Sequence, residues 1–345
     1  MRATVFHGPG DVRVEDVPDP RIEAPTDALV RVVHACVCGS DLWSYRGVSE
    51  KDPGTRTGHE FLGIVEDVGS DVHSVRRGDM VISPFTFSDG DCEFCHRGLQ
   101  TSCVNGGFFS GDTDGGQGEA VRVPYADGTL VPVPSEAAGN DALLTKLTPL
   151  TDVFPTGHHS VVSSGVQRGG TAVVIGDGAV GLCATLAAHR IGAERIVVVG
   201  HHDDRLDIAR RFGATDVVTV RGEDAVAEIL ELTGGGAPSV CECVGLPLSF
   251  DLALRVARDG GTVGYVGVPQ DAALDLSEMF GRNLTVRGGV APARAYIPEL
   301  MADILAGTVD PSPVLDLTVS LDDVPQAFAA MADRRVIKAL VKTAG

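Results

Sequence analysis

The chain has 345 residues, 43% of them hydrophobic, and a formal net charge of −19 at pH 7. This length suits two domains with sizeable cores, and so acidic a chain would repel a phosphate backbone, so we expect no nucleic-acid partner. No segment reaches about 18 uninterrupted apolar residues, and the N-terminal segment mixes charge and proline, so the sequence predicts a soluble, cytoplasmic protein without a membrane partner.

The N-terminal part of the chain, up to about residue 150, contains short valine-rich runs broken by Gly, Pro and Asp, for example at 28–41, 61–69 and 79–85. This texture is typical of an irregular β-rich domain. Four of the eight cysteines lie in apolar runs and are predicted to be buried core residues: Cys36, Cys183, Cys241 and Cys243.

From about Gly169 the pattern changes to apolar, β-branched runs that alternate with amphipathic helical segments. Strands are expected at 171–175, 195–199, 216–220, 239–245 and 262–268, with helices between them. This alternation predicts a doubly wound parallel sheet. Beyond about Val290 a helix near 296–305 and a strand near 336–343 are expected to return to the first domain. The predicted domains are therefore 1–151 with 290–345, and 152–289.

A glycine fingerprint follows the first strand of the predicted sheet and opens the next helix. Gly176 permits a tight turn, Gly178 lets a pyrophosphate approach the backbone, and Gly181 allows the helix to pack closely on the strand. The helix N-terminus at Ala179 and Val180 would face the diphosphate. The sequence therefore predicts a dinucleotide site. Two residues at the ends of later strands, Val244 and Val266, are expected to line it.

The end of the second strand bears on the choice of dinucleotide. An NAD site usually places a carboxylate there to bind the ribose hydroxyls, whereas this chain has Gly200, followed by His201 and His202. The two imidazoles and Arg205 could contact a 2′-phosphate, so the sequence favours NADP, with NAD as the alternative. Asp203 and Asp204 weaken this preference because either could turn toward the ribose, and the histidines could simply cap and solvate the next helix.

Cys38 and the pair His59-Glu60 stand out in the N-terminal domain because few such residues occur around them. Thiolate and imidazole suit zinc, and a catalytic zinc takes about three protein ligands with one open position. Alone, a cysteine and a distant histidine are more often structural.

The order and spacing of these residues resemble those of the zinc-containing alcohol dehydrogenases of the medium-chain dehydrogenase/reductase superfamily. The matching segments are Cys38-Gly-Ser40-Asp41, Gly58-His59-Glu60-Phe-Leu-Gly63, a cluster at Cys92, Cys95 and Cys103, and the glycine fingerprint. The resemblance covers essentially the whole chain. It implies a β-rich GroES-like catalytic domain and a Rossmann domain, and an enzyme that interconverts an alcohol and an aldehyde or ketone by hydride transfer to or from NAD(P).

The resemblance also implies roles for residues at the catalytic metal. Cys38 and His59 would be zinc ligands, and Glu60 a ligand that comes and goes. The third firm ligand is a cysteine in many members, and here Asp152 takes that position, although a helix cap is its ordinary structural role. Such a zinc ion lowers the pKa of the substrate hydroxyl and polarises the carbonyl in the reverse direction.

Three residues near Cys38 would complete the catalytic set. By the same resemblance, Ser40 would hydrogen-bond the substrate hydroxyl and pass its proton outward, and Asp41 would orient the His59 ring. Many relatives carry His three residues after that Ser, whereas this chain has Trp43. The proton must then leave through water, the cofactor ribose or another group, or else Trp43 shapes the substrate pocket.

A second cluster resembles the structural-zinc lobe of the family, in which four cysteines close a tetrahedral site. Here Cys92, Cys95 and Cys103 match and Asp89 stands at the first position. A carboxylate is an acceptable zinc ligand, so a site of one aspartate and three cysteines is expected. Asp91 and His96 are the substitutes for Asp89, and a lobe that has lost its metal is the alternative.

Competing functions share parts of this pattern. A zinc-free quinone or enoyl reductase would not use the metal ligands, a polyol, sugar or amino-acid dehydrogenase would, and a non-catalytic zinc- and nucleotide-binding redox sensor would have no turnover. The substrate pocket is expected near Trp43, Phe85, Phe109, Asp152 and Val290 and to be mostly apolar, which favours an uncharged small-molecule alcohol or carbonyl. The resemblance suggests a homodimer or homotetramer built through segment 283–290.

Overall fold

The computed structural model describes residues 1–343, and the chain divides into two compact units. The first contains Met1–Asp152 together with the chain from Pro292 onward, and the second contains Val153–Ala291. Asp152 therefore belongs to the first unit, whereas the boundaries expected from the sequence lay at 151/152 and 289/290. Among the described residues, no helix is long and apolar enough to cross a membrane.

The first unit is built on a seven-stranded sheet with the order β16-β17-β3-β4-β5-β9, in which β8 pairs with the free part of β3. The strands are β3 (Ala28–Cys36), β4 (Glu60–Val68), β5 (Met80–Ser83), β8 (Ala120–Val123), β9 (Val131–Pro132), β16 (Leu317–Ser320) and β17 (Ala339–Lys342). Two further antiparallel sheets have two strands each. One is the hairpin of β1 (Arg2–Gly8) and β2 (Asp11–Asp16), and the other pairs β6 (Thr86–Phe87) with β7 (Gly107–Phe108).

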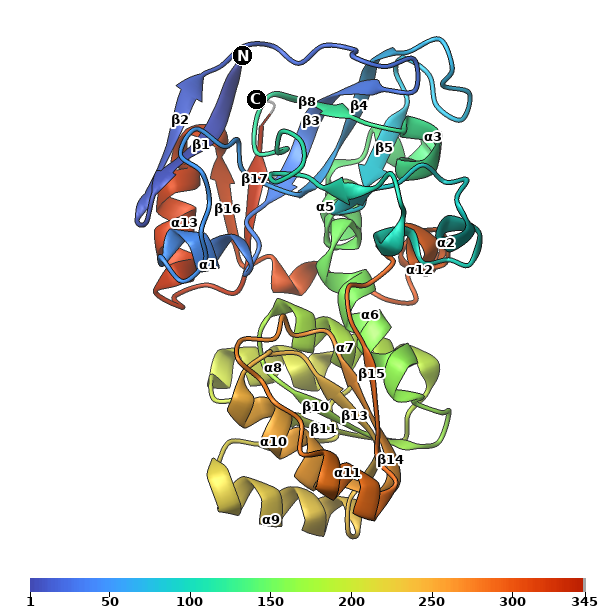
Figure 1. Cartoon of the computed structure of the whole chain (residues 1–345), viewed down its shortest axis with the longest axis vertical. Helices are drawn as coiled ribbons and strands as arrows, with labels where there is room; N and C mark the ends of the chain where they lie inside the picture. Colours follow the sequence, from blue (N-terminus) through green and yellow to red (C-terminus); the bar gives the residue numbers. More distant parts are fainter. Residues whose placement is uncertain (344–345) are drawn as a thin grey trace. The chain divides into compact units, whose positions relative to one another are not determined.

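Short helices lie around this sheet and in the segments that connect its strands (Figure 1). They are α1 (Asp41–Tyr45), α2 (Glu93–His96), α3 (Ala126–Thr129), α4 (Ser135–Ala138), α5 (Asp141–Leu147), α12 (Ala293–Leu305) and α13 (Val324–Ala332), with 3-10 turns η1 (Gln100–Ser102), η2 (Thr148–Thr151), η3 (Ser312–Val314) and η4 (Leu321–Asp323). A core of fully buried residues that includes Val30, Phe61, Val81 and Phe328 holds the unit together.

The C-terminal strand completes the first unit. Strand β17 pairs antiparallel with β3, with Leu340 opposite Cys36 and Val341 opposite Ala35. Buried apolar residues on β17 explain this return, because Ala339, Leu340 and Val341 are at most 1% exposed. The pairing brings Lys338 beside the end of β3, which matters for the site described below.

The second unit is a six-stranded parallel sheet with the order β12-β11-β10-β13-β14-β15. The strands are β10 (Thr171–Ile175), β11 (Arg195–Val199), β12 (Asp216–Val218), β13 (Ala237–Glu242), β14 (Ala257–Tyr265) and β15 (Thr285–Gly288), and the helices are α6 (Val153–Ser164), α7 (Ala179–Ile191), α8 (Asp203–Arg211), α9 (Gly222–Thr233), α10 (Pro247–Val256) and α11 (Leu276–Arg282). Its core includes four completely buried valines, Val173, Val197, Val240 and Val263. The predicted doubly wound parallel sheet is confirmed.

Candidate active site

The first metal-binding cluster consists of Cys38, His59, Glu60 and Asp152, whose ligand atoms all lie within 4.8 Å of one another. Strand pairing brings three of them together: β3 and β4 run antiparallel with Cys36 opposite Glu60, so the end of one strand meets the start of the other. The 3-10 turn η2 then delivers Asp152. Its Oδ2 lies 3.3 Å from Cys38 Sγ and 3.5 Å from His59 Nε2.

The chemistry of this cluster fits a divalent cation. One thiol, one imidazole and two carboxylates converge in a mostly buried space, and this is a zinc ligand set. Burial and the neighbouring Asp152 and Glu60 carboxylates raise the pKa of the Cys38 thiol to about 11. A zinc ion would offset this repulsion because it stabilises the thiolate and neutralises the surrounding acids.

Glu60 is held by Lys338, a residue that was not predicted from the sequence. Lys338 Nζ lies 2.5 Å from Glu60 Oε1 and also donates to the Val37 carbonyl, and both side chains are almost fully buried. Burial lowers the pKa of Lys338, but the negative charges of Glu60, Cys38, Cys36 and Asp152 together outweigh burial and raise it. Glu60 Oε2 is buried and has no partner among residues 1–343. The carboxylate therefore has one oxygen anchored and the other left for a metal.

Asp41 and Gln117 contact the ligand residues of the cluster or the backbone next to them. Asp41 Oδ1 lies 3.6 Å from His59 Nδ1, and its Oδ2 accepts hydrogen bonds from the Cys38 N–H and the Gln117 amide. The Gln117 amide also donates to the Cys36 carbonyl at 2.8 Å. Gln117 was not predicted from the sequence because it lies far from the motif in the chain and only strand pairing brings it near.

Ser40 and Trp43 differ in their relation to the cluster. Ser40 Oγ lies 3.5 Å from His59 Nε2, so it lies next to the metal-binding cluster. Trp43 lies in α1, partly exposed, and its carbonyl accepts a hydrogen bond from Val48 N–H at 2.8 Å. It does not line the cavity described next.

A cavity of about 380 Å³ in the first unit opens beside Ser40 and His59. Its wall is mostly polar, which differs from the apolar pocket expected from the sequence; of the residues named for that pocket, only Phe109 lines it. The lining residues are Ser40, Asp41, Ser44, Ser49, Glu50, Lys51, Asp52, Thr55, His59, Phe108, Phe109, Ser110 and Gly111. Lys51 Nζ donates to Ser110 Oγ at 2.7 Å, and partial burial lowers the pKa of Lys51.

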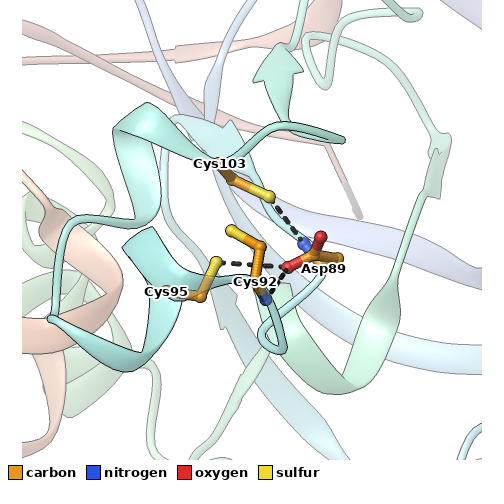
Figure 2. A group of neighbouring side chains, drawn as sticks. All are labelled: Asp89, Cys92, Cys95 and Cys103. Atoms are coloured by element: carbon orange, nitrogen blue, oxygen red, sulfur yellow. Dashed lines mark hydrogen bonds between the residues drawn. The ribbon is translucent and has the colours of Figure 1, made fainter.

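The second cluster gathers Asp89, Cys92, Cys95 and Cys103, again with ligand atoms within 4.8 Å of one another (Figure 2). Asp89 Oδ1 accepts from the N–H of Cys92 at 3.0 Å and from Cys95 Sγ at 3.3 Å, and Asp89 N–H donates to Cys103 Sγ. The Asp89 carboxylate therefore points at the three sulfur atoms. Burial opposes its ionisation, but hydrogen bonds from the N–H groups of Cys92 and Asp91 lower its pKa.

The two substitutes considered for Asp89 lie elsewhere. Asp91 and His96 pair with each other at 3.5 Å, with both side chains largely exposed, and neither belongs to the sulfur cluster. The geometry of one carboxylate and three thiols suits a closed tetrahedral zinc site.

The glycine fingerprint forms the turn between β10 and α7. Gly176 has a positive φ of 116°, and a Cβ at Gly181 would lie 2.0 Å from the Gly176 carbonyl oxygen, so helix and strand approach as closely as the motif requires. Gly178 caps α7, whose first residues are Ala179 and Val180. This leaves the N-terminal N–H groups of α7 at the carboxyl end of the sheet, which is where a pyrophosphate binds.

The other residues predicted for the cofactor lie at the same end of the sheet. Val244 follows β13 and lies beside Gly176, where a Cβ would meet its Cγ2 at 2.8 Å, and Val266 follows β14. Gly200 follows β11, His202 caps α8, and Arg205 is buried in that helix. His201 Nδ1 lies 2.9 Å from the Thr219 carbonyl oxygen.

These two features define a class of protein: a parallel sheet with a dinucleotide fingerprint, and a Cys/His/carboxylate cluster in a separate β-rich unit, are the parts of a zinc- and nicotinamide-dependent dehydrogenase. Comparison with known proteins gives the family. Residues 24–135 match the alcohol dehydrogenase GroES-like domain and residues 179–306 match the zinc-binding dehydrogenase domain. The chain belongs to the zinc-type alcohol dehydrogenase family, as the resemblance in its sequence indicated.

Individual relatives span nearly the whole chain. An uncharacterized zinc-type alcohol dehydrogenase-like protein of Bacillus subtilis is 32% identical, with 95% of this chain and 96% of that protein covered. An alcohol dehydrogenase of Cupriavidus necator is also 32% identical, with 99% and 98% covered. The solved structure of an alcohol dehydrogenase from Thermus sp. ATN1 has a TM-score of 0.92 at 31% identity and covers 99% of each chain.

Proposed function

We propose that this protein oxidises an alcohol to an aldehyde or ketone, or reduces the carbonyl in reverse, with a nicotinamide dinucleotide as hydride acceptor or donor. The observation that carries the proposal is the convergence of Cys38, His59, Glu60 and Asp152 in one mostly buried cluster. The substrate class is supported by relatives that are named alcohol dehydrogenases and that match nearly the full length of this chain.

The residues of the cluster have distinct roles in this proposal. Cys38, His59 and Asp152 hold the catalytic zinc, and Glu60 is the ligand that exchanges. When bound, zinc supplies a Lewis acid that favours loss of the hydroxyl proton. Ser40 would hydrogen-bond the substrate hydroxyl and relay its proton, accepting it at Oγ while its own hydroxyl proton passes to water, and Asp41 would orient the His59 ring through Nδ1.

The proton then needs a route outward, since Trp43 stands where many relatives have histidine. Ser40 lines the polar cavity that also contains Lys51, Ser49 and Thr55. We propose that the proton leaves through water held by these groups. Trp43 does not line this cavity, so the route bypasses it.

The second cluster supports a structural zinc site. Asp89, Cys92, Cys95 and Cys103 supply four ligands, and four protein ligands leave no open position for a substrate. We propose that this zinc stabilises the loop that carries α2 and η1. A lobe without metal would leave three thiols and a carboxylate gathered for no physical reason.

Two of the competing functions gain no support from the site. A zinc-free reductase has no use for either ligand set, whereas a polyol or sugar dehydrogenase would use the same catalytic ligands. A redox sensor without turnover would have no use for a cavity beside the ligands or for Ser40 in its wall.

We further propose that the chain forms a homodimer or homotetramer through segment 283–290. This segment contains β15, one of the two edge strands of the second sheet, and most of its residues are exposed. Unpaired edge strands are templates for pairing with another chain. Light scattering on the wild type and on Val286→Pro tests this proposal, because the loss of one backbone donor should weaken the assembly.

The cofactor is a nicotinamide dinucleotide, and NADP is the preference that Gly200, His201 and His202 suggest from the sequence. That prediction assumes that no carboxylate stands beside the ribose. The structure places the Asp177 carboxylate beside Gly200, His201 and His202.

The experiment that tests the proposed function is a panel of alcohols and ketones, read by nicotinamide absorbance with both cofactors, before and after removal of zinc by a chelator. Zinc-dependent turnover of at least one alcohol–carbonyl pair is expected. Full activity after the metal has been removed and verified absent would refute the proposal.

A further inference from the structure

Asp177 lies between the first two glycines of the fingerprint, and its side chain turns toward the residues after β11. Its Oδ2 accepts hydrogen bonds from the N–H groups of His201 at 2.7 Å and His202 at 3.0 Å, and from the His202 ring Nδ1 at 2.9 Å. All three contacts use the same oxygen. Oδ1 makes no hydrogen bond to any of residues 1–343, so it remains available to a ligand.

The glycine at position 200 follows from this arrangement. A Cβ at Gly200 would lie 2.6 Å from Asp177 Cβ and 2.8 Å from Asp177 Oδ2, which no real side chain tolerates. The space above Gly200 is therefore filled by a carboxylate from the neighbouring turn. The acid that the sequence lacks at the end of β11 is supplied by the end of β10.

We infer that Asp177 is the specificity-determining residue for the dinucleotide and that it selects NAD over NADP. A carboxylate at the carboxyl end of β11 accepts hydrogen bonds from ribose hydroxyls and repels a 2′-phosphate. The inference rests on the proposed function, since it takes the glycine turn as the dinucleotide site. It reverses the preference that the sequence alone suggests.

The groups around Asp177 support this choice. The two backbone N–H groups that could hold a 2′-phosphate already donate to Asp177, and the His202 ring does the same. Burial opposes the charge on Asp177, but hydrogen bonds from His202 and His201 lower the pKa of its carboxyl. The carboxylate is therefore negative near neutral pH, and its repulsion of a phosphate acts at close range.

Equilibrium binding to the zinc-loaded protein tests the inference without any substrate. The two probes are 5′-AMP and adenosine 2′,5′-bisphosphate, which differ only by the 2′-phosphate, and calorimetry gives both dissociation constants. We expect the wild type to bind 5′-AMP more tightly. We expect Asp177→Asn and Asp177→Ala to shift the ratio toward the bisphosphate by about tenfold or more. The ratio of kcat/KM for NAD and NADP should move in the same direction.

The matched controls are Asp203→Asn and Asp204→Asn, which remove the same charge from the exposed first turn of α8. They should leave the ratio nearly unchanged. A wild type that prefers the bisphosphate overturns the inference even if an Asp177 variant fails to fold, and so does an equal shift in a control variant. Failure of both probes to bind would instead count against the dinucleotide site itself.

Discussion

Glu60 and Lys338 form a buried ion pair beside the metal-binding cluster. Both side chains are almost fully buried, and Lys338 supplies the only positive charge paired with Glu60 among the described residues. We expect Lys338→Met to lower the free energy of unfolding at neutral pH by about 3–5 kcal/mol, because it leaves an uncompensated buried carboxylate. Urea denaturation measures this loss.

The control for that variant is the double change Glu60→Gln with Lys338→Met, which removes both charges and should recover much of the stability. The cost of the single change should also shrink at acidic pH, because burial raises the pKa of Glu60 and a protonated carboxyl carries no charge. A Lys338→Met protein as stable as the wild type at neutral pH would contradict this role.

Lys51 offers a prediction about the substrate. Its ammonium group faces the polar cavity and has Ser110 as its one hydrogen-bond partner among residues 1–343. We expect Lys51→Met to raise KM for alcohols that carry a second oxygen acceptor by about tenfold, and to change KM for simple aliphatic alcohols little. Steady-state kinetics on such matched substrates checks this, with Glu50→Gln on the same wall as the control. An equal effect on both substrate groups would argue against a contact with the second oxygen.

Residues next to a motif could be predicted from the sequence, whereas residues brought in by folding could not. Cys38, His59 and Asp89 stand at positions to which the family resemblance assigns metal ligands. Lys338 and Gln117 come from distant segments, and a lysine inside the apolar run 336–343 was the one available signal for a buried ion pair. The direction of the Asp177 side chain depends on the turn, and it changes the meaning of Gly200.

At the scale of elements, the turn between β10 and α7 contains one glycine that we expect to matter mainly for dinucleotide binding and another that the fold itself requires. Gly178 has an ordinary φ of −76°, and apart from its neighbours in the chain no atom of residues 1–343 lies within 4 Å of the place that a Cβ would take there. A Cβ at Gly181, in contrast, would meet backbone at 2.0 Å. We expect Gly178→Ala to keep the fold, at a cost of about 1 kcal/mol or less for the poorer helix cap, and to weaken dinucleotide binding by about tenfold or more because a methyl group blocks the pyrophosphate.

Gly181→Ala is the contrasting variant, since the turn and helix must move apart to admit its methyl group. It should lose stability as well as binding, as measured by thermal unfolding and calorimetry. If Gly178→Ala bound the dinucleotide as tightly as the wild type, the glycine turn would not be the pyrophosphate site.

The element order was largely predictable because the parallel sheet repeats a simple alternation of buried strand and amphipathic helix. The element order of the β-rich unit was less predictable. Its strands β6, β7 and β9 have only two residues each, and their pairing depends on contacts between distant segments. Only its texture, and the return of the C-terminal strand, could be predicted from the sequence.

At the scale of the whole molecule, the net charge of −19 sets how the fold responds to salt. Self-repulsion destabilises a compact state of high charge, and screening shortens from about 10 Å at 0.1 M to about 3 Å at 1 M salt. We therefore expect the melting temperature to rise with sodium chloride over this range. A melting temperature that is constant or falls would show that the acidic surface costs the fold little.

Zinc content measured together with turnover tests the central claim most directly. The wild type should contain close to two zinc ions per chain, one for each four-residue cluster. Cys38→Ser should keep the fold and the zinc at Asp89, Cys92, Cys95 and Cys103, lose the other ion, and lose turnover by a factor of at least about a thousand. A folded Cys38→Ser protein that retains two zinc ions, or that oxidises alcohols at nearly the wild-type rate, would contradict the assignment of the catalytic site.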